Sequence, residues 1–145
     1  MFVPAQLQLA CLLACLMLLV RAGGEEEVVV KKEGPLFVLN DKNFDAFIKN
    51  NTNVLVAFYA MWCPRCRRFM PRFATAAGRL SAAAWDASLA KVDIADYRST
   101  RAVSRKYVFG LLPRILLFRD GKLTDALRGH WTVDSLISWL KKRTS

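Results

Sequence analysis

Histidine, acidic residues and cysteine are all scarce in this chain. It has one histidine, His130, and 12 Asp and Glu residues against 22 Lys and Arg residues, which gives a net charge of +10. Its four cysteines are too few for a disulfide-stapled scaffold. A structural zinc site needs four ligands, so we expect no metal. The 54% hydrophobic content excludes a disordered chain, and we find no internal repeat or second domain.

A long apolar run is also lacking. The longest uncharged one, residues 9–20, has 12 residues, which is too short to span a bilayer but typical of a signal-peptide core. Cleavage after Ala22 fits the small-residue rule, cleavage after Gly24 is a second option, and an uncleaved anchor is the alternative. We therefore predict a signal peptide at 1–22, a charged flexible lead-in at 23–34 and a folded domain at 35–145, with no stable membrane insertion after cleavage.

Signal cleavage changes the cysteine count. Cys11 and Cys15 lie in the signal peptide, so the mature chain keeps only Cys63 and Cys66. A disulfide between these two closes a very small loop and removes little chain entropy from the unfolded state. Redox chemistry therefore explains the pair better than structural stapling.

Strand and helix patterns alternate along the rest of the chain. Apolar and β-branched runs predict strands at 36–39, 54–60, 88–94, 114–119 and 122–127. Helical spacing predicts helices near 44–48, at 64–80, at 99–107 and after Thr132. Asn40 or Asp41 is expected to cap the first of these, and Asp120-Gly121 predicts a hairpin. This order predicts an α/β domain with a mixed sheet.

The segment Cys63-Pro64-Arg65-Cys66 follows a buried strand and opens a helix. Unpaired N–H groups and the helix dipole stabilise a thiolate at that position, and Arg65 adds a positive charge. Pro64 suits the first helical turn, where no N–H is needed. We predict that Cys63 is solvent-exposed and attacks first, while Cys66, one turn later, is shielded and resolves the mixed disulfide.

Residues 58–66, FYAMWCPRC, resemble the FYAPWCxxC signature of thioredoxin domains in the protein disulfide-isomerase family. Residues 38–45 resemble the start of a catalytic domain of protein disulfide-isomerase A4, and the likeness extends from 34 to 140. The resemblance implies a thioredoxin fold with a central mixed sheet flanked by helices. It also implies a thiol-disulfide oxidoreductase or isomerase that acts on cysteines of folding secretory proteins through a redox-active Cys63–Cys66 disulfide.

The same resemblance implies the setting of this chemistry. No bound cofactor is expected, because electrons would be exchanged with glutathione or partner oxidoreductases. The partners would be cysteine-containing client proteins, and we expect a monomer. The location would be the endoplasmic reticulum lumen or the secreted space, since residues 142–145, KRTS, contain no retrieval signal.

Further site residues follow from the resemblance. The cis-proline of the family falls on Pro113, which would face the cysteines and, with Leu112 and Trp62, help to bind the substrate chain. The usual threonine after that proline is Arg114 here. Arg114 would place another charge beside the cysteines and, like Pro64 and Arg65, tune the thiol pKa.

Two departures from the family pattern support a second hypothesis. The buried acid of the family falls on Ala57, and an arginine that tunes the buried cysteine falls on Trp131. Without these groups, turnover could be slow. The alternative function is therefore a redox-weak or inactive, chaperone-type thioredoxin domain that binds clients.

Two surface features remain. The arginines at 65, 67, 68 and 72 form a local basic cluster, for which a solvated face is the simplest interpretation. Polyanion binding is an alternative, but no aromatic platform accompanies the cluster, so we expect no nucleic-acid partner. Asn50-Asn51-Thr52 is an N-glycosylation sequon, and Asn50 is the candidate acceptor.

Overall fold

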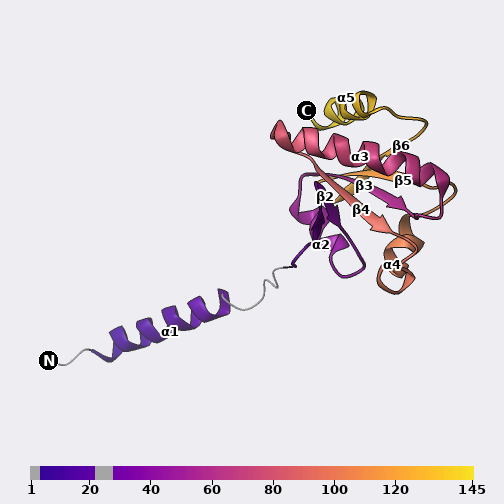
Figure 1. Cartoon of the computed structure of the whole chain (residues 1–145). Coiled ribbons are helices and arrows are strands. Elements are labelled where there is room, and N and C mark those ends of the chain that lie inside the picture. The colour runs from indigo at the N-terminus through magenta and orange to yellow at the C-terminus, as the bar shows by residue number, and fades with distance from the viewer. Residues whose placement is uncertain (1–3, 22–27) are drawn as a thin grey trace.

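The structure is a computed structural model of the chain, and it describes residues 4–21 and 28–145. Helix α1 (Ala5–Arg21) covers most of the predicted signal peptide, and its leucines at positions 7–16 are exposed (Figure 1). Both cleavage positions, after Ala22 and after Gly24, lie outside the described residues. Within the described part of the chain, no helix combines the length and hydropathy that a membrane crossing requires.

The centre of the domain is a six-stranded sheet. Its strands are β1 (Lys32–Glu33), β2 (Leu36–Val38), β3 (Asn53–Tyr59), β4 (Ser88–Asp93), β5 (Arg114–Arg119) and β6 (Lys122–Leu127), in the order β1-β2-β4-β3-β5-β6. Strands β2, β4 and β3 are parallel, whereas β1, β5 and β6 run antiparallel to their neighbours. The predicted mixed sheet is confirmed.

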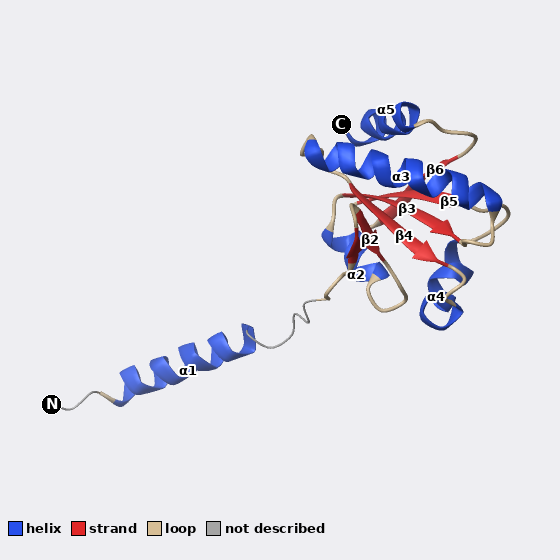
Figure 2. Ribbon diagram, viewed as in Figure 1, coloured by secondary structure: helices blue, strands red, loops and turns tan. Residues whose placement is uncertain are grey.

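Helices cover both faces of this sheet (Figure 2). On one face lie α3 (Pro64–Ala82) and α5 (Val133–Thr144), and on the other lie α2 (Phe44–Asn50) and α4 (Tyr97–Tyr107). Alternate residues of the sheet strands belong to two separate apolar clusters, one under each helix layer. This architecture is the thioredoxin fold that the resemblance implied.

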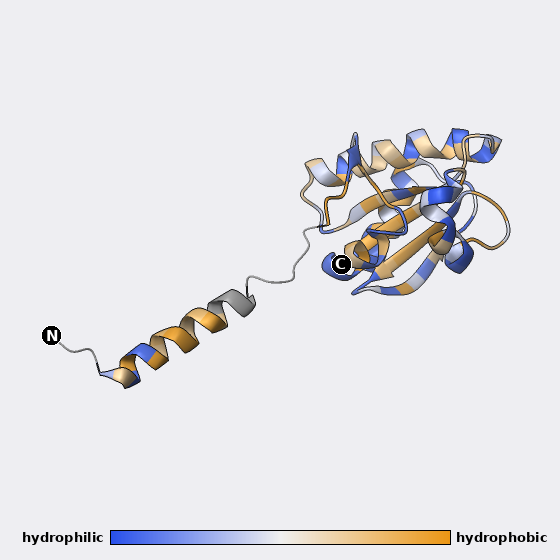
Figure 3. Ribbon diagram, turned by 90° about the horizontal axis from the view of Figure 1, so that it is seen from below, coloured by the Kyte–Doolittle hydropathy of each residue, from blue (hydrophilic) through white to orange (hydrophobic). Residues whose placement is uncertain are grey.

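Strand β3 is buried along its whole length, as the uninterrupted apolar run 54–60 predicted. Leu55 and Ala57 pack beneath α3, while Val56 and Phe58 face α2 and α4. Figure 3 shows hydrophobic colouring on strands of the sheet and along much of α1, whereas the helices of the domain are of mixed colour. The chain that leaves β3 is therefore anchored on both sides just before the cysteines.

Three details differ from the sequence-based expectations. Lys32 and Glu33, placed in the flexible lead-in, form β1, because their backbone pairs with Phe37 and Leu36. The residue that precedes α2 is Asn43 rather than Asn40 or Asp41. The Asp41 carboxylate instead accepts the N–H groups at positions 102 and 103 of α4, a contact between segments far apart in sequence.

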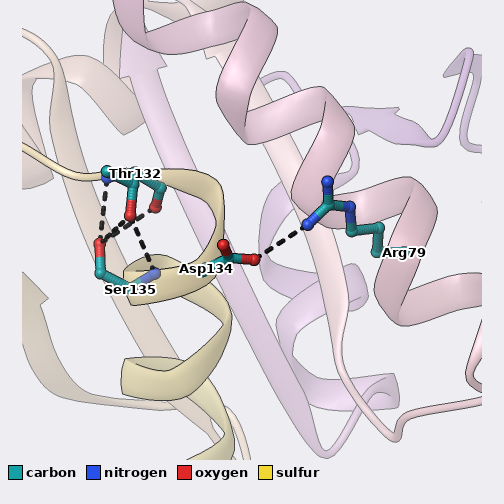
Figure 4. A network of polar contacts seen from close by, with 4 residues as sticks. All are labelled: Arg79, Thr132, Asp134 and Ser135. Atoms are coloured by element: carbon teal, nitrogen blue, oxygen red, sulfur yellow. Dashed lines mark hydrogen bonds and ion pairs between the residues drawn. The ribbon is translucent and has the colours of Figure 1, made fainter.

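The predicted cap of the last helix is confirmed. Thr132 Oγ1 accepts a hydrogen bond from Ser135 N, and Ser135 Oγ accepts one from Thr132 N, which forms a capping box. Figure 4 shows this network beside the ion pair of Arg79 and Asp134, whose Nη1 and Oδ1 atoms are 3.0 Å apart. The ion pair joins α5 to α3.

The hairpin at Asp120-Gly121 is also confirmed, because both residues have the positive φ that a type I′ turn needs.

Candidate active site

Strand pairing brings three loops to one edge of the sheet. Strand β3 ends at Tyr59 and leads into the cysteine segment. Strand β5 begins beside it, because Arg114 pairs with Phe58. Strand β6 ends beside that start, because Leu127 pairs with Ile115. The loops before α3, before β5 and after β6 therefore meet around the cysteines.

The cysteine pair occupies the start of α3. Cys63 is the N-cap of the helix, and its Sγ accepts a hydrogen bond from Cys66 N at 3.3 Å. Pro64 lies in the first turn, as predicted. The structure shows both residues as free thiols, and the Cys63–Cys66 disulfide stays a prediction for the oxidised form.

The two sulfurs differ in accessibility, but less than predicted. Cys66 is fully buried, as expected, whereas Cys63 is only 7% exposed rather than open to solvent. Cys63 is covered because it packs with Tyr59 and Leu112 in one apolar cluster. The expectation of a solvent-exposed Cys63 is therefore wrong. Cys63 is still the more accessible of the two cysteines, as expected.

Local hydrogen bonds favour the thiolate of Cys63. Burial of the sulfur opposes ionisation, but hydrogen bonds from the Cys66 thiol and from the backbone N–H groups of Cys66 and Arg65, with the Arg65 charge, outweigh it. Together they hold the pKa of Cys63 below its ordinary value. The predicted influence of Arg65 thus has a physical basis in the structure.

Cys66 has the opposite electrostatics. Burial, together with its hydrogen bond to Cys63 and the negative charge there, raises the pKa of Cys66 to about 11. A pair with one lowered and one raised thiol pKa is arranged for attack by the first sulfur and resolution by the second. Cys63 therefore has both the lower pKa and the greater exposure of the two cysteines.

Ala57 is fully buried beneath α3. It pairs across the sheet with Lys91, whose ammonium group forms an ion pair with Glu33 and lies 5.7 Å from the ring centre of Tyr59. The hydrogen bond from Lys91 and its charge hold the pKa of the Glu33 carboxyl below its usual range. The carboxylate that Lys91 contacts therefore comes from β1 and not from β3.

The loop before β5 faces the cysteines. Leu112 and Pro113 are joined by a cis peptide bond, as the resemblance implied. Cys63 Sγ donates to Leu112 O at 3.7 Å. The backbone just before Pro113 is thus placed beside the attacking sulfur, which is where the prediction puts the substrate chain.

A cavity of about 570 Å³ opens next to this loop. It brings together Arg65, Pro113 and Arg114, all of which the sequence had singled out. Sequence reasoning missed three of its other walls, Phe109, Leu111 and Arg128. For Phe109 and Leu111, the available signal was the apolar, glycine-containing run at 108–113, because large hydrophobic residues are unusual in an exposed loop.

Large apolar side chains are exposed around the cysteine loop. Trp62 is 68% exposed and Met61 is 56% exposed, while Phe109 and Leu111 project from the facing loop with 65% and 76% exposure. Arg67 Nη1 donates to Met61 O at 2.8 Å and so ties the loop to α3. Exposed apolar surface on the two loops beside Cys63 is suited to a polypeptide ligand.

Other candidate features lie outside this edge. Asn50 is exposed at the end of α2, where its glycosylation stays a prediction. In the described ranges 4–21 and 28–145, no group of three or more His, Cys, Asp or Glu side chains is placed to hold a metal ion.

The fold and the paired cysteines define a thioredoxin-fold domain, and comparison with known proteins agrees. Residues 35–142 match the family model described as Thioredoxin. The chain belongs to the thioredoxin family.

Its relatives include protein disulfide-isomerases. The chain is 35% identical over 121 residues to protein disulfide isomerase-like 1-3 of Arabidopsis thaliana, covering 83% of this chain and 20% of that protein. It is 36% identical over 138 residues to protein disulfide-isomerase of Gallus gallus, covering 91% and 25%. The chain therefore spans only about a fifth to a quarter of the length of these relatives.

A solved structure is similar over most of both chains. The first thioredoxin domain of mouse protein disulfide-isomerase A4 superposes with a TM-score of 0.70 at 28% identity, covering 85% of each chain. The predicted likeness to a domain of protein disulfide-isomerase A4 is thus confirmed.

Proposed function

We propose that this protein is a thiol-disulfide oxidoreductase or isomerase that acts on cysteines of client polypeptides through Cys63 and Cys66. The observation that carries the proposal is the asymmetry of the two thiols, one at a helix N-cap with a lowered pKa and one fully buried with a raised pKa. Relatives named as protein disulfide-isomerases support the same chemistry.

The reduction of a client disulfide would begin at Cys63. The Cys63 thiolate attacks one client sulfur, a mixed disulfide forms, and the other client sulfur leaves as a thiolate that takes a proton. Cys66 then loses its proton and attacks Cys63 Sγ, which releases the second client thiol and forms the Cys63–Cys66 disulfide. Glutathione or a partner oxidoreductase would restore the dithiol. The reverse sequence oxidises a client. In isomerisation, a different client thiolate attacks the client sulfur of the mixed disulfide, which forms a new client disulfide and releases Cys63 as the thiolate.

The surroundings of Cys63 support a polypeptide substrate. The carbonyl of Leu112 lies beside the sulfur, and an extended client chain could pair with the backbone there. Trp62, which precedes Cys63, and Leu111, which precedes Leu112, supply exposed apolar surface. The proposal also places the protein in the endoplasmic reticulum lumen or the secreted space. Cys63 and Cys66 must be able to form a disulfide, and these compartments are oxidising enough to permit it.

A second candidate function rests on one observation. Ala57 leaves the buried thiol of Cys66 without a carboxylate on β3, although the pKa of that thiol is raised to about 11. Slow loss of the Cys66 proton would favour a protein that binds clients and turns over poorly. The exposed apolar side chains around the cysteine loop would serve such a chaperone-type domain equally well.

Two cysteine variants distinguish these functions. We expect the protein to reduce insulin or re-oxidise reduced ribonuclease, and we expect Cys63→Ser to abolish both activities. Cys66→Ser should accumulate mixed disulfides with clients, which non-reducing electrophoresis detects. Activity that persists in Cys63→Ser would contradict the proposed chemistry. Client binding that survives in Cys63→Ser, without turnover in the unmodified protein, would favour the chaperone-type function.

A further inference from the structure

The charged side chains that line the cavity beside Cys63 are all arginines. Five arginines line it: Arg65, Arg68 and Arg72 from α3, Arg114 from β5, and Arg128 from the loop after β6. Among its described lining residues, none is acidic. Three chain segments far apart in sequence therefore contribute the same charge to one concave surface.

These arginines have no carboxylate partner within the described part of the chain. The arginine ion pairs found there belong to Arg79 and Arg143, which lie outside the cavity. Arg72 Nη1 donates only to the backbone carbonyl of Trp131, at 3.3 Å. Arg114 Nε is buried and has no hydrogen-bond partner among the described residues. A guanidinium donor without a protein partner is free to bond to a group from outside the chain, either water or a ligand.

The rest of the lining is apolar. Phe69, Phe109, Leu111 and Trp131 supply aromatic and aliphatic walls, and Pro113 connects the cavity to the carbonyl beside Cys63. A small inorganic anion would leave these walls uncovered. A polypeptide segment with acidic side chains next to its cysteine would cover them and also pair with the guanidinium groups.

We propose that this cavity selects client cysteines flanked by acidic residues. The inference rests on the proposed function, because the client sulfur must reach Cys63 for the flanking residues to enter the cavity. Carboxylates there would accept charge-assisted, in part bidentate, hydrogen bonds from Arg68, Arg114 and Arg128. The cluster of like charges would also speed the encounter with acidic segments. The basic residues thus determine specificity, in addition to the contribution of Arg65 to the reactivity of Cys63.

The test compares three peptides of equal length, each with one cysteine joined to 2-thiopyridine by a disulfide. The residues that flank the cysteine are acidic in one peptide, neutral in the second and basic in the third. The Cys63 thiolate attacks the peptide sulfur, the Cys63–peptide disulfide forms, and pyridine-2-thiolate leaves with the electron pair and takes a proton from water. The absorbance of released thiopyridone, followed by stopped flow with the reduced protein, gives the rate of this first step.

We expect the acidic peptide to react about tenfold faster than the neutral peptide at low salt. The basic peptide should be slowest, and added salt should shrink the differences. The double variant Arg68→Gln/Arg128→Gln should bring the ratio of the acidic rate to the neutral rate close to one. Arg119 is exposed at the far end of β5, so the matched control Arg119→Gln should keep the ratio.

Each of four other outcomes would contradict one specific claim. Equal rates for all three peptides would contradict the acidic preference and leave the proposed function intact. An equal loss of the ratio in Arg119→Gln would assign the preference to net charge rather than to the cavity. Glutathione joined to thiopyridine and reacting as fast as the acidic peptide would assign the site to glutathione instead. Failure to release thiopyridone from any peptide would contradict the proposed function itself.

Discussion

At the scale of single residues, the reactivity of Cys63 is a balance between burial and hydrogen bonding. The residue is only 7% exposed, and this burial by itself would disfavour the thiolate. Donors from Cys66 and from the Arg65 backbone, together with the Arg65 charge, outweigh that effect. Arg114 lies in the same cavity, but its contribution to the thiol pKa stays a prediction.

Replacing Arg65 by glutamine tests the charge contribution. Arg65→Gln keeps the backbone N–H and removes the positive charge, so we expect the pKa of Cys63 to rise by about half a pH unit. A less stable thiolate makes the dithiol form less favourable, and the reduction potential should become more negative by about 15 mV. Thiolate absorbance and glutathione titration measure the two quantities.

The control for Arg65→Gln is Arg98→Gln. Arg98 is an exposed arginine on α4, so its loss changes net charge equally without touching the cysteine loop. An identical change in both variants would show that overall charge, rather than Arg65, influences Cys63.

At the scale of elements, α5 depends on its first turn. Thr132 and Ser135 form a capping box, and the helix buries Leu136 and Leu140 beneath the sheet. Thr132 directly follows Trp131 of the cavity, so this cap also fixes the end of the loop that carries Arg128. The Arg79–Asp134 pair beside it is largely exposed, with 57% and 88% of the two side chains accessible, and contributes little.

Loss of the cap should destabilise the domain. Thr132→Ala removes the oxygen that accepts the Ser135 N–H, and we expect the free energy of unfolding to fall by about 1 kcal/mol. Urea unfolding measures this change. Ser138→Ala, in the exposed middle of α5, is the matched control and should have almost no effect. Equal effects of the two substitutions would contradict a capping role for Thr132.

The elements whose signals are local were predictable from the sequence. The apolar run 54–60, the Asp120-Gly121 turn and the Thr132 cap each carry their own pattern, and each appears as expected. Elements that depend on distant partners were not. Lys32 and Glu33 become a strand only because β2 lies beside them, and Asp41 contacts α4 through a pairing that no local pattern encodes.

In the candidate site, too, the features with a local sequence signal were predictable and those that depend on distant residues were not. The roles proposed for Cys63 and Cys66 were predicted from their order at a helix start, which is visible in the sequence. The low exposure of Cys63 depends on Leu112, which lies about fifty residues away along the chain. The cavity needs three loops to converge at one sheet edge, so Arg128 could not be assigned to it before the strand pairing was known.

At the scale of the whole molecule, one edge of the sheet holds all the features that the proposed chemistry needs. The ends of β3 and β6 and the start of β5 place the thiol pair, the carbonyl of Leu112 and the basic cavity next to each other. The two helix layers (Figure 2) bury an apolar cluster on each face of the sheet, whereas Met61, Trp62, Phe109 and Leu111 stay exposed around the cysteine loop. In the proposed function, a sheet between two helix layers thus presents Cys63, the more accessible of the two cysteines, to a client chain.

The measurement that tests this account most directly is the pH dependence of alkylation of the two cysteines in the reduced protein, followed for each residue by mass spectrometry. A lowered pKa means that the Cys63 thiolate persists as pH falls, so its reaction rate should reach half its maximum below about 8.5, the value of a free cysteine. Cys66 should stay unmodified until strongly alkaline pH, near its pKa of about 11. A midpoint for Cys63 at or above that of a free cysteine, or equal reactivity of Cys66 at neutral pH, would contradict the account.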